Sequence, residues 1–371
     1  MELKLDLERL AIATERRIAF REDINKPFPF IFQCDETDWG AWIPGCPYNF
    51  KEMIEDPFKA AEGQIISFNN QHSKIPSSDW LPVFRTHFYG EGYVPSMFGA
   101  SQVVVENNPP FTEGRVMETI FDVEKLPEKI NPHKDGWGPI VREGMLRMAE
   151  AGQGIVPVGI TDHQSPYGIA TKLLGNEDLM LAMYDEPELV HKLMRISTDA
   201  LIDVIEATKE WIGEENLALC DNHPVRGSKG LILWDDYISV LSPTLYDEFC
   251  LPYNLELYKM YGRGHLHTCG PYFPNYFESI VKNSPVTIDI SIMRDVSKSK
   301  EDILELRKIT RENGIVMIGG LQYRNDSIFD TTPWTEPDID FLREMSNGGL
   351  IWVESTNTEK YNRYLDMYNS L

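Results

Sequence analysis

The chain has 371 residues, of which 42% are hydrophobic and 25% charged, a composition typical of globular proteins and unlike that of disordered segments. Its 35 Lys and Arg against 58 Asp and Glu give a formal net charge of −23. This charge excludes nucleic acid and anionic membrane surfaces as main partners, because both are bound by basic faces. No apolar run approaches the roughly 20 residues of a membrane-spanning helix.

The five cysteines are odd in number and widely spaced, which is typical of a reduced cytoplasmic protein rather than a disulfide scaffold. Residues 1–17 mix apolar and charged side chains and lack the apolar stretch of a secretory signal. We therefore expect a cytoplasmic location.

The first 130 residues are irregular in pattern. Apolar positions at helical spacing predict a helix over Leu3–Ala19, and PFPFIFQC predicts a strand at Pro27–Cys34. A helix is expected near Asp56–Asn69, and short β-like runs at Gln102–Glu106 and Arg115–Ile120 are separated by Gly and Pro. We expect residues 1–130 to form a loop-rich, aromatic-rich N-terminal extension.

From about residue 131 onward, short apolar strands alternate with helices. The predicted strands are Ile155–Thr161, Leu217–Cys220, Gly264–Cys269, Val286–Ile290, Ile315–Ile318 and Leu350–Val353, with a further apolar run at Leu231–Trp234. The predicted helices are Gly136–Gly152, Glu177–Trp211 with a break near Pro187, Pro243–Tyr261, Tyr272–Asn283, Ser299–Asn313, Glu336–Asn347 and Thr358–Met367.

This alternation predicts βαβ units and a parallel sheet. We expect an α/β fold, a (β/α)8 TIM barrel with its main part in residues 131–371 and the N-terminal extension packed on it. A doubly wound open sheet is the alternative. Its dinucleotide-binding version is disfavoured because no G-x-G-x-x-G follows any of the strands.

Polar side chains follow six of these segments. In a barrel of this kind the chemistry lies beyond the carboxyl ends of the strands, so residues at these ends are expected to converge. They are Asp162, His163, Asp221, His223, Asp235, Asp236, His265, His267, Cys269, Asp289 and Glu354. Each one alone is explained as well by loop starts and helix caps; their coincidence at six ends favours a site.

The segment HLHTC carries the most specific pattern. Residues two apart on a strand face the same side, so His267 and Cys269 share one space, which His265 also borders. Imidazole and thiolate together suit zinc, and a catalytic zinc needs a third protein ligand and an open position. As a bare pattern it is more typical of a buried strand with a packed His and Cys.

Three longer segments resemble the uroporphyrinogen decarboxylase superfamily: SPYGIATKLLGNEDLMLAMYDEPELVHKLMRISTDALIDVI at Ser165–Ile205, DDYISVLSPTLYDEFCLPYNLELY at Asp235–Tyr258 and GHLHTCG at Gly264–Gly270. The likeness covers roughly residues 85–365. It implies a (β/α)8 barrel, in agreement with the alternation of strands and helices.

The superfamily has two well-known branches. The tetrapyrrole decarboxylases carry an arginine-rich stretch of the type RQAGRY that grips an acidic substrate. This chain has no Arg between Glu22 and Arg85, so the resemblance points away from that branch, whose substrate needs cationic clamps.

The other branch contains zinc-dependent methyltransferases that work with corrinoid proteins or thiols and carry H-x-C on a barrel strand, here His267 and Cys269. They also carry a Cys near the last strand, whereas no Cys follows Cys269 here. Glu354 is the nearest replacement, and a carboxylate is an acceptable zinc ligand. The resemblance thus implies a metal site of His267, Cys269 and Glu354.

The favoured function is a zinc-dependent methyltransferase that moves a methyl group between a small O-, N- or S-methylated compound and a corrinoid protein or thiol. Asp162, Asp221 and Asp236 are the expected catalytic residues, and His163, His223, His265 and Asp289 the expected substrate-binding residues. One alternative is a metal-free, decarboxylase-like lyase acting on a small acid, with Asp162 or Asp289 in the central role. Another is a non-enzymatic binding barrel. A homodimer is compatible with each.

Overall fold

The computed structural model describes residues 1–23, 30–34, 40–75, 78–220, 230–268, 277–290, 300–320 and 350–356, with four single residues near the C-terminus, Asn362, Leu365, Asp366 and Asn369. The predicted helix at Glu336–Asn347 lies outside these ranges. Of the predicted helix at Thr358–Met367, the described residues include only three, Asn362, Leu365 and Asp366, and all three are helical.

The largest element is a parallel sheet of six strands. Its order is β1 (Phe30–Cys34), β10 (Leu350–Thr356), β9 (Val316–Gly320), β8 (Thr287–Ile290), β7 (Arg263–Thr268) and β6 (Leu231–Trp234). All neighbours are parallel, so the carboxyl ends of these strands lie along one edge. Strand β1 belongs to the N-terminal part of the chain, yet it pairs with the last strand.

Shorter segments continue the array beyond β6. The amide of Ile232 donates to the carbonyl of Leu219 at 2.8 Å, next to β5 (Leu217–Ala218), which pairs in parallel with β4 (Val158–Gly159). Phe84 in turn forms a parallel bridge to Val158. Within the described ranges no strand pairing joins the Phe84 segment to β1, so a closed ring of strands is not seen there.

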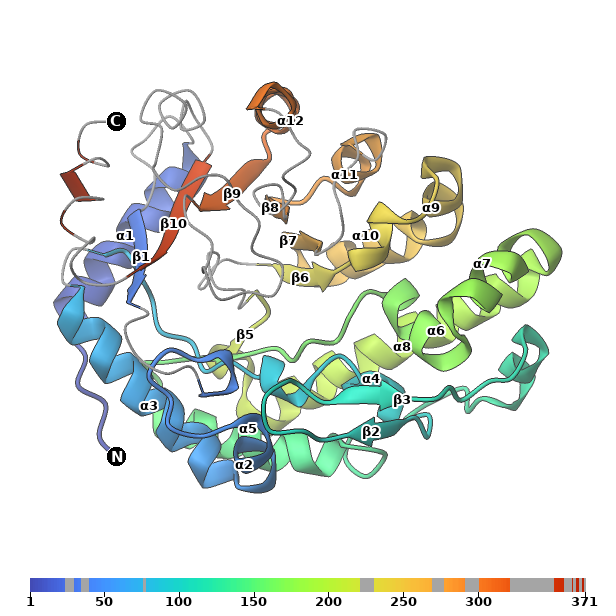
Figure 1. Cartoon of the computed structure of the whole chain (residues 1–371), viewed down its shortest axis with the longest axis horizontal. Coiled ribbons are helices and arrows are strands. Elements are labelled where there is room, and N and C mark those ends of the chain that lie inside the picture. Colours follow the sequence, from blue (N-terminus) through green and yellow to red (C-terminus); the bar gives the residue numbers. More distant parts are fainter. Residues whose placement is uncertain are drawn as a thin grey trace.

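Helices lie outside these strands, as Figure 1 shows for α3, α5, α8 and α10–α12. The helices are α1 (Leu7–Glu22), α2 (Phe50–Glu55), α3 (Pro57–Lys74), α4 (Tyr93–Ser96), α5 (Gly138–Gly152), α6 (Pro166–Leu174), α7 (Asn176–Asp185), α8 (Pro187–Ile212), α9 (Pro243–Phe249), α10 (Leu251–Tyr261), α11 (Phe277–Asn283) and α12 (Lys300–Glu312). Strands β2 (Ser101–Val103) and β3 (Phe111–Glu113) form an antiparallel hairpin. None of the described helices is long and apolar enough to cross a bilayer.

The α/β character predicted from the sequence is confirmed, and most predicted strands and helices are present. The break near Pro187 is also confirmed, because α7 ends at Asp185 and α8 begins at Pro187, where a proline is tolerated in the first helical turn. The division into residues 1–130 and 131–371 stays a prediction.

Two local predictions were wrong, and one helix was missed. The single helix over Pro243–Tyr261 is two helices that meet at Cys250, because Pro252 lacks an amide and starts a new first turn. The run Arg115–Ile120 forms no strand; its amides at Val116 and Met117 bond instead to the carbonyl of Leu173. Helix α6 was not anticipated.

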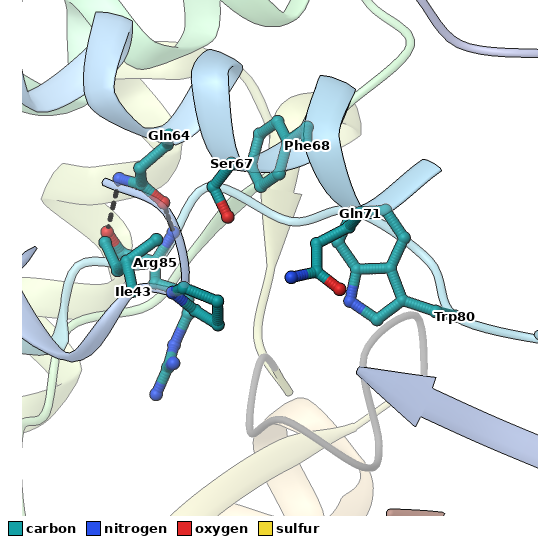
Figure 2. Close-up of a pocket in the computed structure, with 8 residues that line it drawn as sticks. Ile43, Gln64, Ser67, Phe68, Gln71, Trp80 and Arg85 are labelled. Carbon is teal, nitrogen blue, oxygen red and sulfur yellow. Dashed lines mark hydrogen bonds between the residues drawn. The ribbon is translucent and has the colours of Figure 1, made fainter. Parts of the chain in front are cut away.

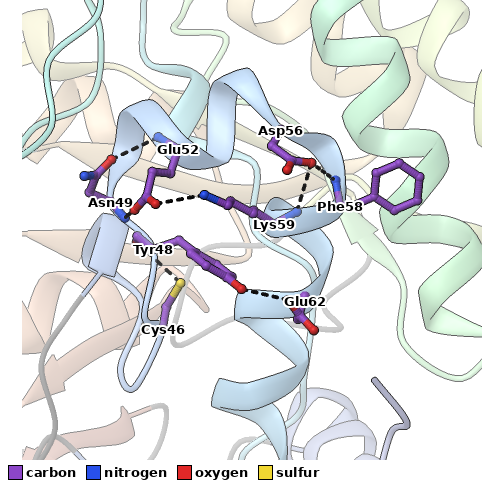
Figure 3. A network of polar contacts seen from close by, with 8 residues as sticks. All are labelled: Cys46, Tyr48, Asn49, Glu52, Asp56, Phe58, Lys59 and Glu62. Atoms are coloured by element: carbon purple, nitrogen blue, oxygen red, sulfur yellow. Dashed lines mark hydrogen bonds and ion pairs between the residues drawn. The ribbon is translucent and has the colours of Figure 1, made fainter.

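Side-chain caps set where α2 and α3 begin (Figure 3). Asn49 and Glu52 form a reciprocal capping box at the start of α2, with bonds of 2.9 and 3.1 Å. Asp56 ends α2 and caps α3 through the amide of Phe58 at 2.9 Å. Each cap satisfies amides that a helix leaves unpaired at its start, so the corner between the two helices is fixed by local hydrogen bonds.

Candidate functional site

The described strand ends bring three of the predicted site residues into one region. Asp162 follows β4, Asp236 follows β6, and His267 lies near the end of β7. Their charges interact, since both Asp236 and His267 influence the pKa of Asp162. These three residues therefore lie near enough for their charges to interact, while their role in a common site stays a prediction.

The other predicted residues are placed only in part. Cys269, Asp221 and His223 lie outside the described residues. For Asp289 and Glu354 the backbone alone is described: Asp289 pairs with His267, and Glu354 pairs with Phe32. Asp289 in turn pairs with Ile318 of β9, which pairs with Ile351 of β10. Ile351 is therefore the residue of β10 in the same row as His267, and Glu354 lies three residues beyond it along the strand.

Asp162 is a partly buried carboxylate with few stabilising partners. Gln164 Nε2 donates to its Oδ1 at 3.0 Å. Burial, together with the negative charges of Asp236 and Glu91, nevertheless raises the pKa of Asp162 to about 7, against the opposing effects of Gln164 and His267. A carboxyl group with this pKa can both hold and release a proton near neutral pH.

The turn that carries Asp162 is unusual in its backbone. Gln164 has φ 60°, in the left-handed region, which is uncommon for a residue other than glycine and recurs at functional sites. Gly168 makes room for it, because a Cβ there would lie 2.8 Å from Gln164 Oε1. Strain and close packing therefore hold the amide of Gln164 next to the Asp162 carboxylate.

His163 and His265 are both fully buried. The Nδ1 of His163 is 2.8 Å from the carbonyl of Thr161, and burial lowers its pKa to about 4, so the ring is neutral. The Nδ1 of His265 is 2.9 Å from Thr287 Oγ1. This burial favours packing roles for both rings over direct substrate contact.

His267 is more accessible and has an aromatic neighbour. Its ring lies edge-on to Trp234, with 4.7 Å between the ring centres and 63° between the planes. Trp234 is partly buried, and its Nε1 has no hydrogen-bond partner in the described part of the chain. An indole donor without a partner at a strand end can donate a hydrogen bond to a ligand. The sequence pattern did not predict this role for Trp234.

An ion pair also borders the site. Lys172 on α6 pairs with Glu91, and the charges of both residues reach Asp162. Tyr237, at the start of the loop after β6, adds to the field at Lys172. Sequence reasoning missed Lys172 and Glu91, because they are 81 positions apart and neither follows a predicted strand.

The two described cavities lie elsewhere. One, of about 10 Å³, is lined by Gln64, Arg85 and their neighbours on α3 (Figure 2) and holds one water molecule at most. The other, of about 310 Å³, lies between α3, α5 and Met1. Among the described side chains no group of three His, Cys, Asp or Glu has metal-ligand geometry; the position of Cys269 is not among them.

Comparison with known proteins gives a consistent picture. The family described as Uroporphyrinogen decarboxylase (URO-D) matches residues 47–321. A solved structure of a methyltransferase from Methanosarcina mazei is similar to this chain, with a TM-score of 0.65, 14% sequence identity and 99% of each chain covered. No curated protein sequence matches significantly. At this identity the solved structure establishes a shared fold and nothing finer.

Proposed function

Because the chain belongs to the uroporphyrinogen decarboxylase family, we propose that it is a methyltransferase, moving a methyl group between a small O-, N- or S-methylated compound and a corrinoid protein or a thiol. The observation that carries the proposal is the gathering of Asp162, Asp236 and His267 at the carboxyl ends of three strands. The solved structure that matches 99% of this chain is that of a methyltransferase, which supports this choice within the family.

The proposed metal site consists of His267 and Cys269, with Glu354 as the third ligand that the family resemblance suggested. Imidazole and thiolate are ligand types that zinc binds in proteins, so His267 and Cys269 fit the ion. Glu354 lies three residues, an odd number, beyond the row of His267, and alternate strand residues face opposite sides, so the register disfavours it as the third ligand. His267 is the one whose described side chain supports a metal site: its ring is partly exposed near the end of β7, where it lies edge-on to Trp234. Zinc bound there would supply a Lewis acid for the heteroatom of the methylated compound or the thiol.

The carboxylates have the chemistry that the methyl donor or acceptor requires. Asp162, with a pKa of about 7, is proposed to give a proton to the heteroatom that loses its methyl group, or to take one from the thiol that gains it. Asp236, and Asp221 earlier in the chain, are proposed to orient that group, with His223 and Asp289 as further contacts. The partly buried rings of Trp234 and Tyr237 supply apolar surface.

A metal-free lyase is the second candidate. It is favoured by one observation, the raised pKa of Asp162, because a carboxyl group protonated near neutral pH can protonate the carbanion left when a small acid loses carbon dioxide. The same side chain thus serves either reaction. The two candidates differ in product and in metal dependence.

The full chain is therefore assayed with methyl-labelled phenyl ethers, methylamines and thioethers, each with cob(I)alamin or a thiol as acceptor. In parallel, small carboxylic acids are assayed for carbon dioxide release. We expect label in methylcobalamin or the thioether product, and its loss on chelation. Release of carbon dioxide that is insensitive to chelator, without methyl transfer, would establish the lyase instead.

A further inference from the structure

Asp235 lies beside Asp236 but has a different environment. Asp236 is partly exposed at the site, whereas Asp235 is fully buried. Its carboxylate accepts hydrogen bonds from Tyr246 of α9 at 2.6 Å and from Asn254 of α10 at 2.8 Å, both on Oδ2. A buried carboxylate is costly unless donors satisfy it. The hydrogen bonds around Asp235 therefore offset the cost of burying its carboxyl group.

The hydrogens of this network are directed toward Asp235. The Tyr246 hydroxyl accepts from Asn254 Nδ2 at 2.9 Å and from Asn283 Nδ2 at 3.0 Å, so its own hydrogen is left for Asp235. Ser165 Oγ likewise accepts from the amide of Gly168 at 3.2 Å and donates to Asp235 Oδ1 at 3.2 Å. Two hydroxyls and one amide thus donate to the carboxyl oxygens of Asp235, and these bonds oppose the burial that raises its pKa.

Through these bonds Asp235 joins the three segments of the candidate site. Its carboxylate holds Ser165, the last residue of the turn that begins at Asp162, and the Ser165 amide bonds to the carbonyl of Trp234 at 2.8 Å. Its backbone amide donates to the carbonyl of His267 at 2.9 Å. One residue therefore connects the end of β4, the end of β6 and the end of β7.

We propose that Asp235 is the positioning residue of the site: its buried carboxylate, oriented by Tyr246 and Asn254, fixes the relative placement of Asp162, Trp234 and His267. Asp235 does not touch the reacting groups, and it acts through the segments that carry them. Rigid support of this kind is what holds catalytic groups within the narrow tolerance that group transfer needs. The catalytic part of the inference rests on the proposed function, whereas the structural part does not.

The chain offers matched variants to test this. Tyr246→Phe removes one hydroxyl from the network, and Asp235→Asn keeps the shape but turns an amide hydrogen toward a donor. Tyr253→Phe is the control. Tyr253 is on α10 next to Asn254, but its hydroxyl bonds outside the network, to the carbonyl of His191 at 3.2 Å. Ile205→Ala shortens a buried side chain of α8 and serves as a control for a general loss of stability.

The readout is amide hydrogen exchange of peptides covering residues 160–168, 231–239 and 190–205. In Tyr246→Phe and Asp235→Asn we expect protection of the first two peptides to fall about ten- to a hundredfold relative to the third, the factor for a lost hydrogen bond to a charged group. The two control variants should not produce this local difference. A fall shared equally by all three peptides, or no fall, would overturn the proposal.

A kinetic arm uses the methyl transfer assay. If Asp235 positions the reacting groups, Tyr246→Phe lowers kcat with little change in KM, while Tyr253→Phe alters neither. A change confined to KM would count against positioning. If the wild-type chain transfers no methyl group, the proposed function fails, and the exchange experiment still decides the role of Asp235.

Discussion

Two carboxylates that follow strands, Asp162 and Asp235, show how packing separates residues that look alike in sequence. Asp162 has one amide donor and two negative neighbours, Asp236 and Glu91, and its pKa is raised to about 7. Asp235 has three donors, which oppose the rise of its pKa caused by burial in the core. Only the arrangement of the helices around β6 distinguishes the carboxyl group proposed to react from the one proposed to position it.

The raised pKa of Asp162 predicts a pH-dependent stability. Its folded pKa of about 7 exceeds the ordinary value of 3.8, so the folded state binds the proton more tightly, and this stabilisation is lost as the pH rises through 7. We expect the free energy of unfolding of wild type, relative to Asp162→Asn, to fall between pH 3.8 and pH 7, by at most about 1.4 kcal/mol per pH unit.

Urea unfolding of both proteins across this range measures the difference, and Asp56→Asn serves as an exposed-cap control. A difference between wild type and Asp162→Asn that stays constant with pH would contradict the assigned environment of Asp162.

At the scale of elements, one buried side chain connects a helix to the strand array. Gln64 on α3 is fully buried; its Nε2 donates to the carbonyl of Arg85 at 2.9 Å, and its Oε1 accepts from the Arg85 amide at 2.6 Å (Figure 2). The amide thus satisfies the backbone next to Phe84, at the end of the described strand array. Helix α3 is tied to that segment by these two bonds.

Gln64→Leu should therefore destabilise the protein by about 2–4 kcal/mol, because it removes two hydrogen bonds from the partly buried backbone of Arg85. Asn70→Ala, at a partly exposed position of the same helix, is the control. Denaturant unfolding gives the free energy of unfolding of each variant. Equal stability of the Gln64→Leu and Asn70→Ala proteins would show that the two bonds contribute nothing.

Most helices and strands could be predicted from the sequence, whereas the side-chain contacts between distant elements could not. Apolar runs and prolines mark the strands and the start of α8, because their periods follow from local geometry. The pairing of Glu91 with Lys172 and the convergence of Ser165, Tyr246 and Asn254 on Asp235 join distant positions, and no local pattern records them. The split between α9 and α10 was missed, although the proline that follows Cys250 signals it.

At the scale of the whole molecule, the charge imbalance is the dominant feature. With 58 acidic against 35 basic side chains, self-repulsion opposes the compact state. We expect the melting temperature to rise when NaCl is increased from about 10 mM to about 200 mM, because the screening length falls from about 30 Å to below 10 Å. KCl at the same ionic strength should give the same rise, and an unchanged or lower melting temperature would mean that stabilising ion pairs outweigh repulsion.

The fold places the carboxyl ends of its parallel strands at one edge, and the proposed methyl transfer depends on the side chains at that edge, above all His267. The most direct test is the rate of methyl transfer by His267→Ala beside wild type, with His191→Ala on α8 as the control. We predict that His267→Ala loses activity at least about a hundredfold, since losing even an outer partner of a metal ligand costs 10- to 100-fold, while His191→Ala stays active. Equal rates in all three proteins would contradict the account.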